Sequence, residues 1–225
     1  MPNKKVKKYQ SIVVIGRKGS GKTYYISKKL LPELQVKKSR RFLISPTAEN
    51  DDTLSKKFNK ENVFLQFKDD ILEHIKSVIE EETKELTFKF HHRWDKEKEE
   101  YVVIKSRIKK KPQLPAYLLI ADDCAGSKAF KQNGALSCFY TRHRHLRTHV
   151  ITVSHAYRQT PVLMRVNSNR LIIFNQNNSE MSKIEQEHSK EPKSKDFFDI
   201  FRQATDPEYG TFIIDYYSKP IYKNK

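Results

Sequence analysis

A glycine-rich stretch, GRKGSGKT at residues 16–23, is the clearest chemical signal in the chain. The chain has only 6 glycines, and three of them fall between positions 16 and 21. Their spacing fits G-x-x-x-x-G-K-[ST], a loop whose backbone N–H groups surround a chain of phosphates. In such a loop Lys22 would reach the β- and γ-phosphates, and the Thr23 hydroxyl would hold Mg²⁺. We therefore expect ATP and Mg²⁺ to bind here, with contacts from Gly16, Gly19, Ser20, Gly21, Lys22, Thr23 and Tyr24.

The residues around this loop predict the elements that position it. The β-branched run at residues 12–15 indicates a buried strand, and the segment from Thr23 to about Leu34 has the character of a helix. A strand, a loop and a helix in this order place the positive end of the helix at the phosphates.

A pair of carboxylates follows a second apolar run, YLLIADD at residues 117–123. Four apolar residues and an alanine carry Asp122 and Asp123 to the carboxyl end of a buried strand, where ligands of α/β proteins bind. Asp122 could orient Mg²⁺ and its water shell, and Asp123 could polarise an attacking water as a catalytic base. The alternative is an acidic cap on a following helix.

A third apolar run, HVITVSH at residues 149–155, ends in Ser154 and His155. A polar side chain at this point could sense the γ-phosphate, and we name His155 as a catalytic candidate; the alternative is an ordinary loop histidine. The preceding TRHRHLRTH segment lies in a helix that we expect from about Lys128 to Arg147. Its arginines could face DNA, face solvent or supply an arginine finger. His145 and His149 are four residues apart, but no cysteine or acidic cluster completes a tetrahedral set, so we expect no zinc.

The remaining pattern predicts one α/β domain from residue 11 to residue 225, preceded by a basic arm at residues 1–10. Further strands are expected at residues 40–47, 63–67 and 170–176 and in GTFIIDYY, and helices at residues 69–84, 178–189 and 195–205. Between about residues 86 and 111, two strands flank the charged DKEKEE, which indicates an inserted β-hairpin. The basic run at the end of its second strand is either a solvated tip or a set of phosphate contacts, Lys105, Arg107, Lys109, Lys110 and Lys111.

The formal net charge of +17 predicts a polyanionic partner, nucleic acid first and an acidic membrane surface second. Solubility alone is the simpler explanation, but ordinary domains remain soluble with far smaller charge. The two cysteines form no disulfide framework and indicate a reducing compartment. Without a signal-peptide pattern or a long apolar stretch, we expect a soluble protein that is neither secreted nor an integral membrane protein.

Three segments together resemble the poxvirus-type viral genome packaging ATPases, a branch of the FtsK/HerA translocases. They are GRKGSGKT, YLLIADD and, above all, RHLRTHVITVSHAYRQTPVLMRVN, and the similarity runs from about Ser11 to Asn178 apart from the inserted hairpin. The resemblance implies a P-loop NTPase fold, a mostly parallel central sheet flanked by helices, with the sensor strand between the loop strand and the Asp-Asp strand. His155 stands where the family usually has a glutamine sensor. Of the family's Gly-Arg-His, only Arg144 and His145 carry over, which makes Arg144 the candidate for a finger acting on a neighbouring subunit. Arg147 follows at i+3 on the same face of the expected helix and is the reserve candidate.

The resemblance also implies an ATPase that forms a homo-oligomeric ring, a pentamer or hexamer, and pulls double-stranded DNA through a central pore. Its partners would be DNA and a viral capsid or packaging vertex, in the virion or the host cytoplasm. Two other functions stay open: a nucleoside or nucleotide kinase, and a DNA-binding structural protein with a passive nucleotide site. A kinase has no need of the +17 charge, and the intact Lys22, Thr23, Asp122 and Asp123 argue against a passive site.

Overall fold

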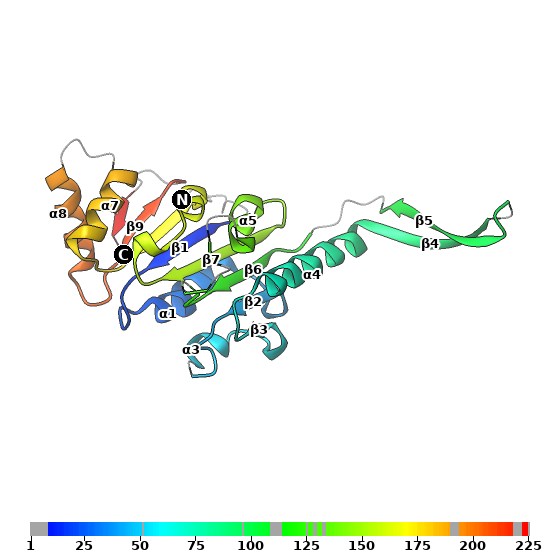
Figure 1. The fold of residues 1–225 in the computed structure, drawn as a ribbon, viewed down its shortest axis with the longest axis horizontal. Helices are drawn as coiled ribbons and strands as arrows, with labels where there is room; N and C mark the ends of the chain where they lie inside the picture. Colours follow the sequence, from blue (N-terminus) through cyan, green and yellow to red (C-terminus); the bar gives the residue numbers. More distant parts are fainter. Residues whose placement is uncertain are drawn as a thin grey trace, which may run out of the picture.

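The computed structural model describes residues 9–50, 52–95, 97–108, 114–124, 126–127, 130–131, 134–189, 194–217 and 222–224. Their fold is an eight-stranded sheet between two layers of helices, with a separate two-stranded hairpin at one end (Figure 1). The predicted α/β class with an inserted hairpin is confirmed. None of the described helices is both long and apolar enough to cross a membrane.

The central sheet has the strand order β10-β9-β8-β1-β7-β6-β2-β3. Six neighbouring strands, from β8 to β3, run parallel, and β9 and β10 add an antiparallel edge. The strands are β1 (Ser11–Ile15), β2 (Arg41–Ile44), β3 (Val63–Phe64), β6 (Tyr117–Ala121), β7 (Thr148–Ser154), β8 (Arg170–Ile173), β9 (Phe212–Asp215) and β10 (Tyr222–Asn224). The strand β7 lies between β1 and β6, as the resemblance implied.

Alternate residues of the sheet face two separate cores, as the two-residue period of a strand requires. Val13 and Ile15 pack with α4 (Asp69–Thr87), α5 (Ala135–Arg142), α6 (Val162–Asn167), α7 (Asn178–His188) and α8 (Ser194–Thr205). Ile12 and Val14 face the opposite side, against the helical segment of residues 22–34 and α3 (Asp52–Ser55). Because both faces are covered, β1 is buried along its whole length.

The helical segment after β1 is continuous but not uniform. It begins as α1 (Lys22–Tyr25), widens into a π-helical turn at Ile26–Leu30 and ends as α2 (Leu31–Leu34). Three short 3₁₀ turns complete the regular structure at Lys38–Arg40, Lys60–Asn62 and Tyr157–Gln159.

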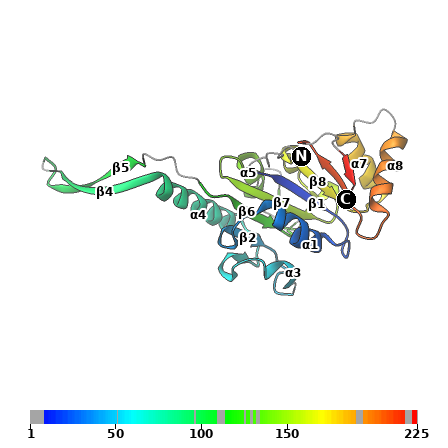
Figure 2. The same ribbon diagram turned by 180° about the vertical axis from the view of Figure 1, so that it is seen from behind.

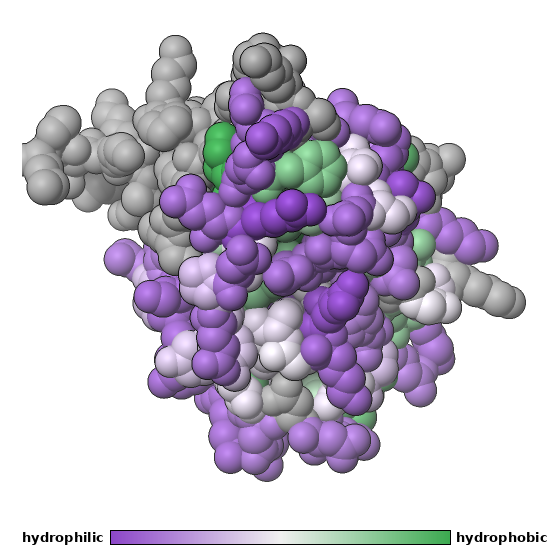
Figure 3. All heavy atoms as spheres, turned by 90° about the vertical axis from the view of Figure 1, so that its left-hand side faces the viewer, coloured by the Kyte–Doolittle hydropathy of each residue, from purple (hydrophilic) through white to green (hydrophobic). Residues whose placement is uncertain are grey.

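The inserted hairpin consists of β4 (Phe88–Asp95) and β5 (Glu100–Arg107), and it projects away from the body beyond the end of α4 (Figures 1 and 2). It begins later than expected because α4 continues to Thr87, where the Thr87 hydroxyl donates to the Thr83 carbonyl. At the opposite end of the sheet, around α7 and α8, the visible surface is mainly hydrophilic (Figure 3).

Two predicted segments differ in the structure. Tyr9 and Gln10, the last residues of the predicted basic arm, are buried on the domain, where the Gln10 backbone N–H donates to His149 Nδ1 over 3.1 Å. The rest of the arm, residues 1–8, lies outside the described residues, as do Lys109, Lys110 and Lys111.

The helix expected to reach Arg147 ends at Arg142 instead. The following residues form a turn, in which the Thr148 N–H donates to the His143 carbonyl over 2.8 Å. Arg147 has a left-handed backbone (φ 52°), and its carbonyl accepts the Tyr117 N–H at the start of β6. Arg144 and Arg147 therefore do not share a helical face, which corrects the sequence-based interpretation.

Candidate functional site

The phosphate loop, residues 16–23, leaves the carboxyl end of β1 and is fixed to the neighbouring strand. The Gly16 N–H donates to the Ser154 carbonyl at the end of β7 over 3.1 Å. A Cβ on Gly16 would lie 2.5 Å from Ser20 Oγ and 2.9 Å from Phe174 Cβ, so no larger residue fits here. Gly21 has a φ of 91°, which favours glycine, and it lies immediately before the first residue of α1.

Lys22 is the first residue of α1, and its side chain folds back onto the loop. Its Nζ donates to the carbonyl oxygens of Gly16 and Arg17 over 2.6 Å and 2.8 Å. Burial lowers the pKa of Lys22, and the charges of Asp122 and Asp123 oppose that shift. The ammonium group therefore faces both the loop and the two carboxylates, which is where a phosphate chain would need positive charge.

Asp122 and Asp123 follow β6 at the same edge of the sheet. The Asp122 N–H donates to the Ile44 carbonyl over 2.9 Å, which ties this corner to the end of β2. Asp123 has a left-handed backbone (φ 52°), a conformation that aspartate tolerates better than most residues. This turn directs the Asp123 carboxylate toward β7 rather than along its own strand.

His155 follows β7 and meets Asp123 directly. Its Nε2 lies 3.1 Å from Asp123 Oδ1, and both side chains are 43% exposed. Because a carboxylate only accepts hydrogen bonds, Nε2 is the donor of this hydrogen bond. The hydroxyl of Ser154, by contrast, is used locally, as a donor to the Ala156 carbonyl.

Four of the predicted site residues are therefore brought together by strand order alone. The strands β1, β7 and β6 are parallel neighbours, so the loop, His155 and the Asp122–Asp123 pair leave the sheet at one edge. In this arrangement Asp123, held by His155 and facing the buried Lys22, can act as a base that polarises a water for attack on a phosphoryl group.

The oxygen ligands expected for Mg²⁺ fit this edge chemically. Thr23 and Asp122 offer one hydroxyl and one carboxylate, the ligand type that Mg²⁺ prefers, while it keeps waters and substrate phosphates as its other ligands. Within the described part of the chain, no group of three or more histidine, cysteine, aspartate or glutamate side chains forms a metal cage.

A hollow of about 650 Å³ lies against the phosphate loop, and its lining includes two residues that the sequence did not indicate, Thr53 and Tyr209. Tyr209 comes from the turn between α8 and β9, and its ring carbon Cδ1 would lie 2.8 Å from a Cβ on Gly21. The DPEYG sequence at residues 206–210 suggests a turn, but it carries no sign that the turn lies beside the loop. The lining residues are Gly19, Ser20, Gly21, Lys22, Thr23, Tyr24, Thr53 and Tyr209.

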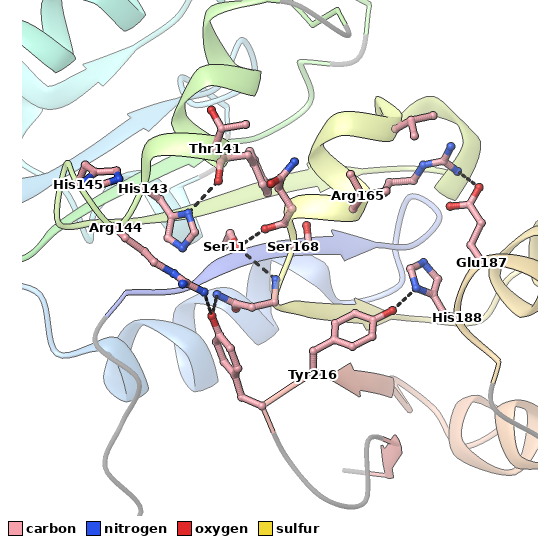
Figure 4. A pocket seen from close by; sticks show the side chains of 16 residues that line it. Ser11, Thr141, His143, Arg144, His145, Arg165, Ser168, Glu187, His188 and Tyr216 are labelled. Atoms are coloured by element: carbon pink, nitrogen blue, oxygen red, sulfur yellow. Dashed lines mark hydrogen bonds and ion pairs between the residues drawn. The ribbon is translucent and has the colours of Figure 1, made fainter.

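Arg144 lies at the opposite edge of the sheet from the loop. It lines a second hollow, of about 790 Å³, that includes Ser11 at the amino end of β1 (Figure 4). The side chain is exposed and its guanidinium donates to the Tyr217 hydroxyl. Arg147 is instead half-buried and donates to the Thr83 hydroxyl on α4.

The two described DNA candidates, Lys105 and Arg107, lie on β5, far from the loop (Figure 1). Cross-strand pairing places Lys105 opposite Phe90 and Arg107 opposite Phe88. Lys105 Nζ also lies 3.9 Å from the centre of the Phe88 ring, a cation–π contact.

Comparisons with known proteins agree with the fold and the motifs. The family model described as "Poxvirus A32 protein" matches residues 2–218. No curated protein matches the chain.

Several solved structures are similar at low sequence identity. The genome packaging NTPase B204 from Sulfolobus turreted icosahedral virus 2, in complex with AMPPCP, is 17% identical over 95% of both chains, with a TM-score of 0.61. The same NTPase in complex with ATP-gammaS is 16% identical over 96% of both chains, with a TM-score of 0.62. EssC (ATPases 2 and 3) from Geobacillus thermodenitrificans is 14% identical over 95% of this chain and 38% of its own, with a TM-score of 0.58.

Proposed function

The chain belongs to the poxvirus A32 protein family, and on this premise we propose that it is an ATPase that moves double-stranded DNA into a viral capsid. One observation carries the enzymatic part: Lys22, the Asp122–Asp123 pair and His155 meet at one edge of the sheet. The nucleotide-bound state of the B204 NTPase, which has the same fold, supports ATP as the substrate. The extreme positive charge supports DNA as the polyanion.

In this mechanism the phosphate loop and Lys22 bind the phosphate chain of ATP. The Lys22 ammonium exchanges its two loop carbonyls for phosphate oxygens, because hydrogen bonds between two charged groups are stronger than those to neutral carbonyls. Thr23 and Asp122 would hold Mg²⁺, which supplies charge neutralisation at the phosphates. Asp123 accepts the proton of the attacking water, while His155 orients its carboxylate through Nε2.

Arg144 acts on a neighbouring subunit of a homo-oligomeric ring. Its position at the sheet edge opposite the phosphate loop excludes a direct contact with the loop of its own chain. The transferring phosphoryl group carries charge that one lysine and one metal ion neutralise only in part, so an arginine from outside completes the site. We place the ring at the packaging vertex, in the virion or the host cytoplasm, with one ATPase domain and one inserted hairpin per chain.

The test is ATP turnover, measured alone, with long duplex DNA and with a panel of nucleosides. A translocase hydrolyses ATP faster with duplex DNA. The Lys22→Ala variant should lose ATP turnover because the phosphates no longer contact a cation. Its thermal unfolding without nucleotide should be little changed. Phosphate transfer to a nucleoside would indicate a kinase instead. Turnover of Lys22→Ala within threefold of the unaltered protein would rule out the loop as the active site.

A further inference from the structure

The lining of the hollow beside the phosphate loop extends beyond the residues of the loop. The loop residues from Gly19 to Thr23 account for its polar end. The rest is lined by Tyr24, Thr53 and Tyr209, to which phosphate binding assigns no role. A nucleotide held by its phosphates must place its sugar and base in some direction from the loop, and this space adjoins it.

Tyr209 has an unusual geometry for a residue without a function. Its backbone is left-handed (φ 58°), a conformation that is strained for a bulky residue. The residue is nevertheless 60% exposed, so burial in a core does not offset this strain. The hydroxyl bonds to the neighbouring Glu208 carboxylate, which raises the pKa of the Tyr209 phenol.

The ring of Tyr209 stands directly against the loop. Its Cδ1 and Cγ would lie 2.8 Å and 3.4 Å from a Cβ on Gly21, so the ring covers the backbone just before Lys22. The turn that carries it follows α8, and it lies beside the loop after β1 in both ribbon views (Figures 1 and 2). Gly21 therefore serves two needs, a left-handed backbone and room for this ring.

Tyr24 is a second exposed aromatic residue of the same hollow. It comes one residue after Thr23, in the first turn of α1, and is 61% exposed. Two exposed tyrosines beside a phosphate loop offer flat surfaces to an aromatic ligand, and every nucleobase has a flat face that stacks on such rings.

We propose that Tyr209 and Tyr24 form the base-binding part of the nucleotide site, with Tyr209 as the principal stacking surface. The assignment rests on the proposed ATPase function. Because stacking does not read the edge of a base, this part of the site accepts adenine and guanine alike. The turn between α8 and β9, more than 180 residues after the loop, thereby becomes part of the active site.

The experiment is calorimetric titration of the full chain, in Mg²⁺, with ATP, GTP and inorganic tripolyphosphate. Loss of one stacking surface lowers nucleotide affinity by about 5- to 150-fold. We expect Tyr209→Ala to lower the affinity for ATP and GTP by this factor and to leave the affinity for tripolyphosphate unchanged. Tyr209→Phe should bind both nucleotides as the unaltered protein does. Tyr101→Ala, the same change at a 70% exposed tyrosine on the distant hairpin, is the matched control and changes none of the three affinities.

The outcomes separate this proposal from the one on which it rests. If Lys22→Ala abolishes ATP binding but Tyr209→Ala binds ATP as the unaltered protein does, the base-binding role is wrong and the ATPase assignment stands. Equal weakening of ATP and tripolyphosphate by Tyr209→Ala would also overturn it, because the ring would then only support the loop. If the unaltered protein binds neither ATP nor GTP, both proposals fail.

Discussion

At the scale of single residues, the contact between His155 and Asp123 orients the Asp123 carboxylate in the site. The two side chains come from neighbouring strands and lie 3.1 Å apart at Nε2 and Oδ1. A histidine that holds the base can transmit the state of the site to β7, since any movement of the carboxylate also moves the imidazole. This links the proposed sensor strand to hydrolysis.

The two carboxylates should respond differently to neutralisation. We expect Asp123→Asn to slow hydrolysis by about 10²- to 10⁴-fold, the range for a general base, with little change in ATP affinity. Asp122→Asn should instead raise the Mg²⁺ concentration needed for half-maximal turnover. Steady-state rates over a series of ATP and Mg²⁺ concentrations measure both effects.

His155→Ala supplies the internal control, because its effect should be much smaller in the Asp123→Asn background than alone if both act through one contact. Equal losses of ATP affinity in the two aspartate variants would contradict the division of roles.

At the scale of elements, the sequence predicted those parts that depend on local pattern. The GRKGSGKT spacing, the apolar strand runs and the periodicity of α4 were sufficient for the loop, β1, β6, β7 and most helices. The end of α5 was wrong because the turn is set by distant partners: Arg147 is held between Tyr117 and Thr83. Tyr209 was missed for the same reason, since nothing local to residues 206–210 reveals what they pack against.

The inserted hairpin is the element from which we expect DNA contacts. A two-stranded sheet alone in water is only marginally stable, so a projecting hairpin is suited to a partner. Lys105→Glu with Arg107→Glu should weaken duplex affinity and reduce the slope of log affinity against log salt by about 2. For the unaltered protein, six or more phosphate contacts correspond to a loss of about 10³ or more in affinity between 50 and 200 mM salt.

A matched control is Lys28→Glu with Lys29→Glu, which changes the net charge equally on exposed residues of the π-helical turn. If both pairs reduce affinity and salt slope alike, the effect is that of net charge. If the hairpin pair changes neither quantity, the DNA path lies elsewhere.

Buried histidines should make the fold sensitive to mild acid. Burial lowers the pKa of His149 and of His188 to about 4, with His143 adding to the first shift and Arg165 to the second, and Glu187 opposing the second. Between the unfolded pKa of about 6.5 and the folded value, only the unfolded chain takes up the proton, so stability is complete above this window and falls as the pH decreases through it.

We expect a melting temperature about 5–15 °C lower at pH 5 than at pH 7, from a loss of a few kcal/mol. Differential scanning calorimetry of His188→Asn should give a smaller decrease, while His92→Asn, at an exposed hairpin position, should retain the full one. A melting temperature independent of pH over this range would show that folding does not lower the pKa of these histidines.

At the scale of the whole molecule, the proposed sites for the nucleotide, the arginine finger and DNA lie on different sides. The loop and Arg144 occupy opposite edges of the sheet, and the hairpin extends beyond the end of α4 (Figure 1). A chain with these features on separate sides can join head to tail, so that one subunit's Arg144 meets the next subunit's loop.

Mixed assemblies test the shared site. Arg144→Ala subunits and Lys22→Ala subunits, each inactive alone, should regain part of the turnover when combined, because intact Lys22 sites then meet intact Arg144 neighbours. An arginine finger supplies a factor of about 10³ to 10⁵, so even a minority of restored sites is measurable. If mixed rings form without activity at any ratio, and Arg144→Ala alone loses only DNA affinity, the finger role is excluded.

The central claim is that ATP hydrolysis moves this protein along duplex DNA, and displacement of a third strand tests it most directly. A triplex-forming oligonucleotide bound within a long duplex is removed when a motor passes along that duplex. We predict release that requires ATP and Mg²⁺ and is absent with Lys22→Ala and with a non-hydrolysable analogue. Equal release without ATP, or active DNA-dependent hydrolysis with no release, would contradict the account.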